Sequence, residues 1–303
     1  MNVNIRRIKA FIMVATTHNV TEAARRMNMT APAITKGVRE LEQALGAALF
    51  QRTSQGMQLT AEGKAFYLHS KRALRELEDG QRAVSDLRGG VGGKVAVAAQ
   101  SDVLNFMLPT AVAQVLKRVP DLELEFAGGD FDNLVHSTRV GDLDLFVGLV
   151  PEAGHVDGLT VEVLYEDELS IVVRADHPLL QKKRLTLKEL TNQSWIRPTE
   201  SLTMEHLLKD SFDSDSIPYP KRWIMVRPLG AMRTILYNTD FLAAVSRMRV
   251  HEELGAGLLK ILPVELPNTR HQVAIFSRGD EYLSRWARQV VIALRRIKRG
   301  ANP

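Results

Sequence analysis

The sequence predicts a multidomain α/β protein made of an N-terminal winged helix-turn-helix, a long linker helix and a C-terminal α/β domain in two lobes. Residues 19–36 are typical of two short helices joined by a tight polar turn. Between residues 66 and 91, apolar residues recur at spacings of four and three, as in a helix that pairs. From Lys94 onward, predicted strands alternate with predicted helices. The length of 303 residues suits two or three domains.

Composition and charge narrow the class of protein. With 45% hydrophobic and 25% charged residues, the chain is typical of globular proteins, and we expect neither a signal peptide nor a membrane span. The absence of Cys excludes disulfides, cysteine-ligated zinc and thiol catalysis, and it fits a cytoplasmic location. Residues 1–90 hold 14 Lys and Arg against 8 Asp and Glu, whereas residues 91–303 hold 26 against 27. The first third is therefore expected to dock on phosphates, with a chance imbalance as the alternative.

The first 46 residues predict three short helices. Apolar residues at helical spacing indicate an amphipathic helix over residues 4–17. Thr21 is expected to cap the second helix, and Asn28-Met29 forms the turn. Thr30 caps the third helix, which ends at Gly46.

The third helix has a polar face opposite its buried stripe. In a helix-turn-helix this helix lies in the DNA major groove. Thr35 can then hydrogen-bond a base or a phosphate, and Lys36 and Arg39 can bind phosphates or guanine edges. An ordinary solvated helix face is the alternative. The face carries Ala31, Pro32, Thr35, Lys36 and Arg39.

Residues 49–60 predict a β-hairpin with a polar tip. A basic hairpin beside a helix-turn-helix is a wing. Arg52 can reach the DNA backbone or the minor groove, or it can only brace the wing. Ser54 at the tip joins the DNA-binding candidates, which also include Thr21 and Thr30.

Residues 4–65 resemble the DNA-binding domain of the LysR-type transcriptional regulators. His18-Asn19-Val20 stands where the family usually has Gly-Ser-Phe, and Thr30-Ala31 stands where it usually has Ser-Gln. Ala31 lacks the amide that pairs with adenine, so the half-site sequence is left open. The matching pieces are Ala10-Phe11, Thr21-x-Ala23-Ala24, Pro32-Ala33-Ile34-Thr35, Leu41-Glu42, Leu45-Gly46, Leu49-Phe50-x-Arg52 and Leu59-Thr60-x-x-Gly63.

Residues 60–91 follow the winged domain (1–59) and predict a linker. Thr60 caps a long helix that runs to about Leu87, and a glycine-rich hinge follows. A heptad seam predicts that this helix pairs with a copy of itself, although Ser70 and Gly80 weaken the seam. The alternative is a single helix packed on its own domain. The residues assigned to the dimer contact are Phe66, Ala73, Leu77, Val84 and Leu87.

Residues 92–303 predict a two-lobed α/β domain. The first lobe takes residues 92–162 and 268–303, because the strand at 272–276 and the final helix at 282–298 are expected to return to it. The second lobe takes residues 163–267. Two crossings between the lobes resemble the periplasmic-binding-protein-like effector domain of the LysR family.

Folds of this kind bind ligands in the cleft between lobes, at the carboxyl ends of strands. Ser101 would offer a hydroxyl beside free N–H groups at a helix start, which suits an anion. Arg227 would favour an acidic or phosphorylated effector. Asp102, Asp130 and Glu200 would repel an anion and favour a sugar or a zwitterion. Ordinary helix caps and a surface charge are the alternatives. The effector candidates are Ser101, Asp102, Gly128, Asp130, Thr199, Ser201, Thr203 and Arg227.

No pattern predicts an enzyme. The eight His have no metal-binding spacing, and the sequence has no nucleophile elbow, so we expect no catalytic residue and no metal. We expect no cofactor either, beyond a small effector such as an organic acid, a sugar or a sugar acid. The resemblance implies a cytoplasmic regulator that binds an interrupted inverted repeat in double-stranded DNA as a homodimer or homotetramer and contacts RNA polymerase. A constitutive DNA-binding protein and an enzyme that doubles as a repressor stay open.

Overall fold

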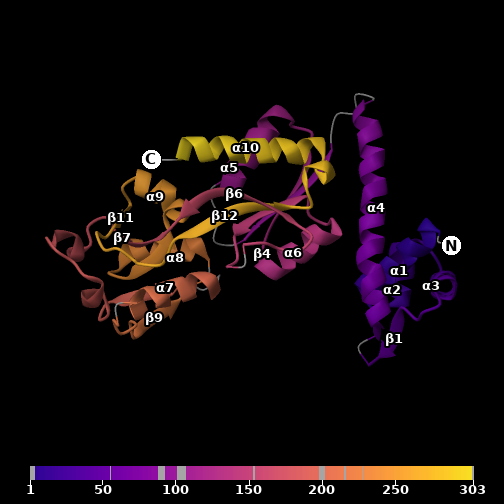
Figure 1. Ribbon diagram of the computed structural model, residues 1–303, viewed down its shortest axis with the longest axis horizontal. Coiled ribbons are helices and arrows are strands. Elements are labelled where there is room, and N and C mark those ends of the chain that lie inside the picture. Colours follow the sequence, from indigo (N-terminus) through magenta and orange to yellow (C-terminus); the bar gives the residue numbers. More distant parts are fainter. Residues whose placement is uncertain are drawn as a thin grey trace. The chain divides into compact units, whose positions relative to one another are not determined.

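The computed structural model describes residues 4–54, 56–87, 93–100, 107–152, 154–197, 202–214, 216–226 and 228–301 (Figure 1). The chain divides into two compact units. Residues 1–91 and 139–142 form the first, and residues 92–138 and 143–303 form the second. Among the described residues, no helix is both long enough and apolar enough to cross a membrane.

In the described part of residues 4–87, four helices and a two-stranded hairpin share one core. Their apolar faces converge on Phe11, whose ring centroid lies 5.3 Å from that of Phe50 and 5.4 Å from that of Phe66. The hairpin and the first turns of the long helix therefore close the core that the three short helices begin. In chain order the elements are α1 (Ile5–Thr17), α2 (Val20–Arg26), α3 (Ala31–Leu45), β1 (Phe50–Thr53), β2 (Gly56–Leu59) and α4 (Ala61–Leu87).

The second unit contains two five-stranded mixed sheets, each covered on both faces. The first sheet has the order β4-β3-β5-β12-β6, with α5 and α10 on one face and α6 on the other (Figure 1). Buried residues of β3 alternate between these two faces, which explains the apolar run at 95–99. The elements are β3 (Lys94–Gln100), α5 (Met107–Arg118), β4 (Glu123–Gly129), α6 (Phe131–Val140), β5 (Leu145–Leu149), β6 (Thr160–Asp167), β12 (His271–Ser277) and α10 (Arg285–Ala301).

The second sheet has the order β11-β7-β10-β8-β9. Trp195 is fully buried beneath α7, and its indole N–H donates to the carbonyl of Leu190 at 2.9 Å. Helix α8 packs on the opposite face. The elements are β7 (Leu169–Arg174), β8 (Ser194–Arg197), α7 (Leu202–Ser214), β9 (Arg222–Met225), α8 (Leu229–Asn238), β10 (Leu242–Ser246), α9 (His251–Gly255) and β11 (Leu259–Ile261), with short 3₁₀ turns between them.

The boundary between the lobes lies later than the sequence suggested. Strand β6 pairs with β12 along its whole length, from Thr160 opposite Ser277 to Asp167 opposite His271. The first lobe therefore extends to Asp167, and the predicted division at residues 162 and 163 is wrong. No turn residue marks the true boundary within this strand. Because β6 lies at the edge of its sheet and is partly exposed, its sequence did not indicate which sheet it joins. The predicted return of strand 272–276 and of the final helix to the first lobe is confirmed.

Candidate DNA-binding surface and effector cleft

Helix α3 displays the polar face that the sequence predicted. Thr30 caps it by accepting a hydrogen bond from the Ala33 amide at 3.4 Å, and Ile34, Val38 and Leu41 are buried beneath it. The opposite side forms one shallow depression in the surface. The structure therefore brings five of the predicted DNA-contact residues together: Ala31, Pro32, Thr35, Lys36 and Arg39.

The hydroxyl of Thr35 is already engaged. It donates to the carbonyl of Ala31 at 2.9 Å, and the side chain is half-buried. Because that bond uses the hydroxyl hydrogen, Thr35 can meet a nucleic acid as an acceptor or through its methyl group, but it cannot donate to a phosphate without breaking the bond.

Three residues near this face were missed from sequence. Glu40 pairs with Arg7 of α1 at 2.7 Å and lies 4.0 Å from the ammonium of Lys36, and Gln43 lines the same depression. Lys36 remains 78% exposed at its side chain, and Arg39 makes no ion pair within the described part of the chain. The spacing of Lys36 and Glu40, four residues apart on one helix, could have placed Glu40 on this face, but its pairing with Arg7, 33 residues earlier, gave no signal.

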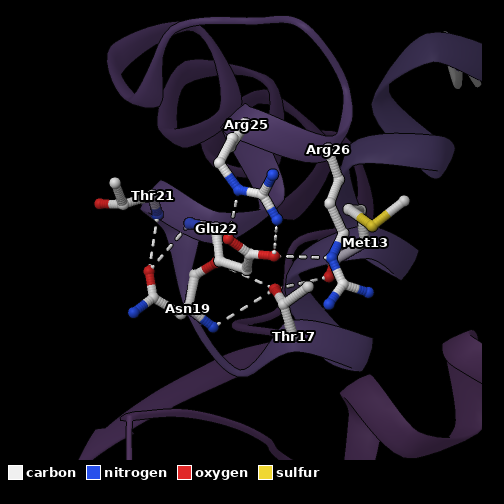
Figure 2. Close-up of polar contacts among 7 residues, drawn as sticks. All are labelled: Met13, Thr17, Asn19, Thr21, Glu22, Arg25 and Arg26. Atoms are coloured by element: carbon white, nitrogen blue, oxygen red, sulfur yellow. Dashed lines mark hydrogen bonds and ion pairs between the residues drawn. The ribbon is translucent and has the colours of Figure 1, made fainter.

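Helix α2 is capped by Asn19 rather than by Thr21, which corrects the sequence prediction. The Asn19 side-chain oxygen accepts from the amides of Thr21 at 2.8 Å and Glu22 at 3.1 Å (Figure 2). Asn is among the strongest N-caps, and it binds the free N–H groups of the first turn. Thr21 lies inside the helix, exposed and free of a capping role.

Glu22 pairs with both arginines of α2. Its carboxylate accepts from Arg25 at 2.7 Å and from Arg26 at 2.8 Å, so that both guanidinium groups fold onto it (Figure 2). The hydrogen bonds from Arg25 and then Arg26 lower the pKa of Glu22 to about 2. At neutral pH a single carboxylate therefore holds both guanidinium groups, in contrast to Arg39 of α3, which makes no ion pair among the described residues.

The wing is fixed to α1 through the main chain. The amide of Met57 donates to the carbonyl of His18 at 2.9 Å, and His18 itself has a positive φ of 53°. Gly56 has φ +105°, and a Cβ there would collide with the His18 carbonyl oxygen. On the wing, Arg52 and Ser54 are exposed. Among the described residues the side chain of Arg52 makes no hydrogen bond or ion pair, so it does not brace the hairpin through a polar contact.

The predicted dimer seam of α4 divides into two parts. Phe66 packs against Phe11 in the core of its own unit, so it is not available to a partner helix. Ala73 is exposed, and Leu77 and Val84 are 50% and 54% exposed. The side chain of Leu87 lies outside the described part. Thr60 caps the helix as predicted, accepting from the Gly63 amide at 2.9 Å.

Of the effector candidates, two can be placed with their side chains. Gly128 lies near the end of β4, opposite Ala99 of β3. Asp130 immediately precedes α6, where its carboxylate accepts from the Asn133 amide at 3.1 Å and from the Asn133 side-chain N–H at 2.6 Å. These bonds lower the pKa of Asp130, which acts as an ordinary helix cap. Outside the described residues lie Ser101, Asp102, Thr199, Ser201 and Arg227, and the side chain of Thr203.

The strand ends near the predicted cleft are held by polar groups that the sequence did not single out. Gln100, the last residue of β3, is buried and accepts from the Leu149 amide at 3.0 Å. At the crossing between lobes, the hydroxyl of Ser246 donates to the carboxylate of Asp167. Both contacts join strands, so both are structural.

Comparison with known proteins identifies both parts of the chain. The family "Bacterial regulatory helix-turn-helix protein, lysR family" matches residues 5–64, and "LysR substrate binding domain" matches residues 88–298. The chain is 28% identical over 292 residues to the HTH-type transcriptional regulator GalR of Pseudomonas putida, covering 96% of this chain and 73% of that protein.

Two solved structures share the fold. A full-length OxyR variant from Pseudomonas aeruginosa has a TM-score of 0.70 at 17% identity, covering 99% of this chain and 95% of its own. Full-length CbnR in complex with its target DNA has a TM-score of 0.60 at 20% identity, covering 97% of this chain and 99% of its own. The fold class, the family and the regulatory function predicted from sequence are confirmed. The chain belongs to the LysR family of DNA-binding transcriptional regulators and joins an N-terminal helix-turn-helix to a C-terminal effector-binding domain.

Proposed function

We propose that this chain is a cytoplasmic, ligand-responsive regulator in which α3 enters the major groove and the wing holds the adjacent DNA backbone. The distribution of unpaired positive charge supports this assignment. Lys36 is exposed and lies 4.0 Å from Glu40, and Arg39 and Arg52 are exposed and make no ion pair among the described residues, whereas Arg25 and Arg26 both pair with Glu22. Arg39 and Arg52 can therefore bind phosphates without first giving up an ion pair, which Arg25 and Arg26 cannot.

The salt dependence of DNA binding tests this assignment. Replacing Arg39→Gln should weaken binding to all sequences and lower the slope of log affinity against log salt by about 0.9 if the side chain holds one phosphate. Relaxed specificity at a single base pair would instead make Arg39 a base contact. Arg25→Gln is the matched control, because that guanidinium is already engaged by Glu22. An equal loss of slope in both variants would contradict the proposal.

A second part of the proposal concerns assembly. We infer that two copies of α4 pair through the exposed stripe of Ala73, Leu77 and Val84, which would present two α3 helices to the halves of an interrupted inverted repeat. Exposed Leu and Val seven residues apart on a charged helix support this pairing. Further association to a tetramer that bends DNA and contacts RNA polymerase belongs to the same proposal.

The third part concerns the effector. We propose that a small polar ligand binds between the lobes, beside the carboxyl ends of β3, β4, β8 and β9. The short connections between the lobes support a hinge there, since the first crossing has only Glu168 between β6 and β7. A ligand regulates only if its affinity differs between the two arrangements of the lobes. No cofactor other than this ligand is part of the proposal.

Thermal shift of the full chain tests the effector. We would screen sugars, sugar phosphates, aromatic and aliphatic acids and amino acids, and a true effector should raise the melting temperature as its concentration exceeds its dissociation constant. Arg227→Ala should remove the response to an anion and spare that to a neutral sugar. A blank across every class would favour a constitutive DNA-binding protein whose α/β part only assembles the oligomer.

A further inference from the structure

A pocket lies between α5 and α10 on one face of the first sheet. Its volume is about 210 Å³. Val115 and Val119 from the α5 side and Ile292 from α10 line its floor, and the indole of Trp286 forms a wall. Apolar cavities of about 150 Å³ hold a benzene ring, whereas drug-sized ligands use roughly 300–1,000 Å³. The space therefore fits one flat ring with a small substituent.

The rim of this pocket is strongly cationic. Arg118, Arg285 and Arg296 line it, all three are exposed, and no described lining residue carries a carboxylate. Arg285 lies over the Trp286 ring, with its guanidinium carbon 4.8 Å from the ring centroid. Within the described part of the chain, none of the three takes part in an ion pair. Three like charges around one small pocket repel each other, and a bound anion would relieve that cost.

Other arginines of α10 are engaged elsewhere. Arg295 makes two hydrogen bonds of 2.7 Å to the carboxylate of Glu162, and Arg288 donates to the carbonyl of Asp280 at 3.2 Å. The basic character of this helix is therefore not a uniformly solvated face. Among the arginines of α10 whose side chains the structure describes, Arg285 and Arg296 line the pocket and make no ion pair.

We propose that the α5–α10 pocket binds a small organic anion consisting of one flat apolar ring and a carboxylate. The ring would stack on Trp286 over the apolar floor. The carboxylate would meet the guanidinium forks of Arg118 and Arg296, whose planar geometry suits bidentate pairing. This site is separate from the cleft, and it requires neither DNA binding nor the proposed cleft effector.

The position of Trp286 gives the site a route to regulation. A Cβ added at Gly93 would lie 2.6 Å from Cδ1 and 2.9 Å from Nε1 of this indole, so the ring packs directly on the glycine backbone. Gly93 immediately precedes β3, where the chain enters the second unit after the linker. A ligand that fixes the Trp286 ring would therefore fix the start of the effector domain.

Fluorine NMR of the full-length chain labelled with 5-fluorotryptophan tests the proposal. The chain has three Trp, and Trp286→Phe assigns the resonance of interest by its loss. Phenylacetate should move the Trp286 resonance saturably and leave those of Trp195 and Trp223 in place. Arg118→Gln and Arg296→Gln should each weaken this binding about tenfold or more, since each removes a charge-assisted hydrogen bond. Arg288→Gln, on the same helix but outside the lining, should bind normally.

Four results would overturn the proposal. An equal response to phenylacetamide would show that the charge is not recognised, and an equal response to inorganic phosphate would show that the ring is not. A response to target DNA that Arg118→Gln abolishes would make the pocket a DNA contact. No movement up to about 10 mM phenylacetate, where a ligand of about 1 mM dissociation constant is mostly bound, would leave no site. Because the titration with phenylacetate uses no DNA, its failure leaves the assignment of α3 intact.

Discussion

The exposed stripe of α4 allows the strength of self-association to be worked out. Leu77 and Val84 lie seven residues apart and are 50% and 54% exposed in the single chain. Full burial of a Leu or Val side chain contributes about 1.5–3 kcal/mol, so burying the remaining half contributes about 0.8–1.5 kcal/mol for each. A symmetric dimer has four such side chains, which gives roughly 3–6 kcal/mol for the seam.

The double variant Leu77→Ala, Val84→Ala removes most of that burial. We expect its dimer dissociation constant to rise by about 10²–10⁴-fold. Alanine favours helix, so α4 itself should persist, and circular dichroism checks this. Sedimentation equilibrium over a concentration series measures the constant directly.

A matched control is available on the same helix. Glu78 is exposed and lies about 100° around the helix from Leu77, so Glu78→Ala should leave the dissociation constant unchanged. If the double variant kept its helix and dimerised as tightly as the unmodified chain, the seam would lie elsewhere and the reasoning from α4 would be refuted.

Three further predictions concern the DNA-binding unit. In urea melts, Asn19→Ala should lower the free energy of unfolding by about 1 kcal/mol through loss of the cap, whereas Thr21→Ala should change it by less than about 0.5 kcal/mol. The reverse order would show that Thr21 is the cap. Glu22 has a pKa of about 2 in the fold against 4.5 in the unfolded chain, so its stabilising contribution is present above pH 4.5 and is lost as the pH falls towards 2. Glu22→Gln should therefore flatten the dependence of the free energy of unfolding on pH in that range. An unchanged dependence would contradict the pairing of Glu22 with the arginines. Gly56→Ala places a Cβ at a positive φ and against the His18 carbonyl oxygen, so it should lower the free energy of unfolding by more than about 1 kcal/mol. Gly46→Ala, at φ +69° with open space around it, should lower the free energy of unfolding by less. Equal losses would mean that the contact between the wing and α1 is not tight.

Elements with strong local signals were predicted closely from sequence. Helix α4 begins after the Thr60 cap and ends at Leu87, as predicted. Helix α3 is bounded by the Thr30 cap and by Gly46 in the left-handed conformation. In each case the residues that set the boundary lie within the element or next to it, so no knowledge of distant partners was needed.

Contacts between distant residues could not be predicted in this way. The side chain of Glu42 accepts from the Leu49 amide at 2.8 Å, which ties α3 to the hairpin and gives a physical role to a motif that was recognised only as a resemblance. Phe66 fits the heptad spacing, yet it packs on Phe11. Spacing tells which face of a helix is apolar, but it does not tell what covers that face. The same limit placed the end of β6 in the wrong lobe.

The backbone bond between the wing and α1 makes hydrogen exchange informative in this protein. The Met57 amide belongs to the hairpin, but its acceptor, the His18 carbonyl, lies outside it. Such an amide exchanges with deuterium only when the bond opens, so its exchange rate measures how often the wing separates from α1. Bound DNA that holds both elements would slow this one amide beyond the rest of the hairpin, whereas DNA that holds the wing alone would not.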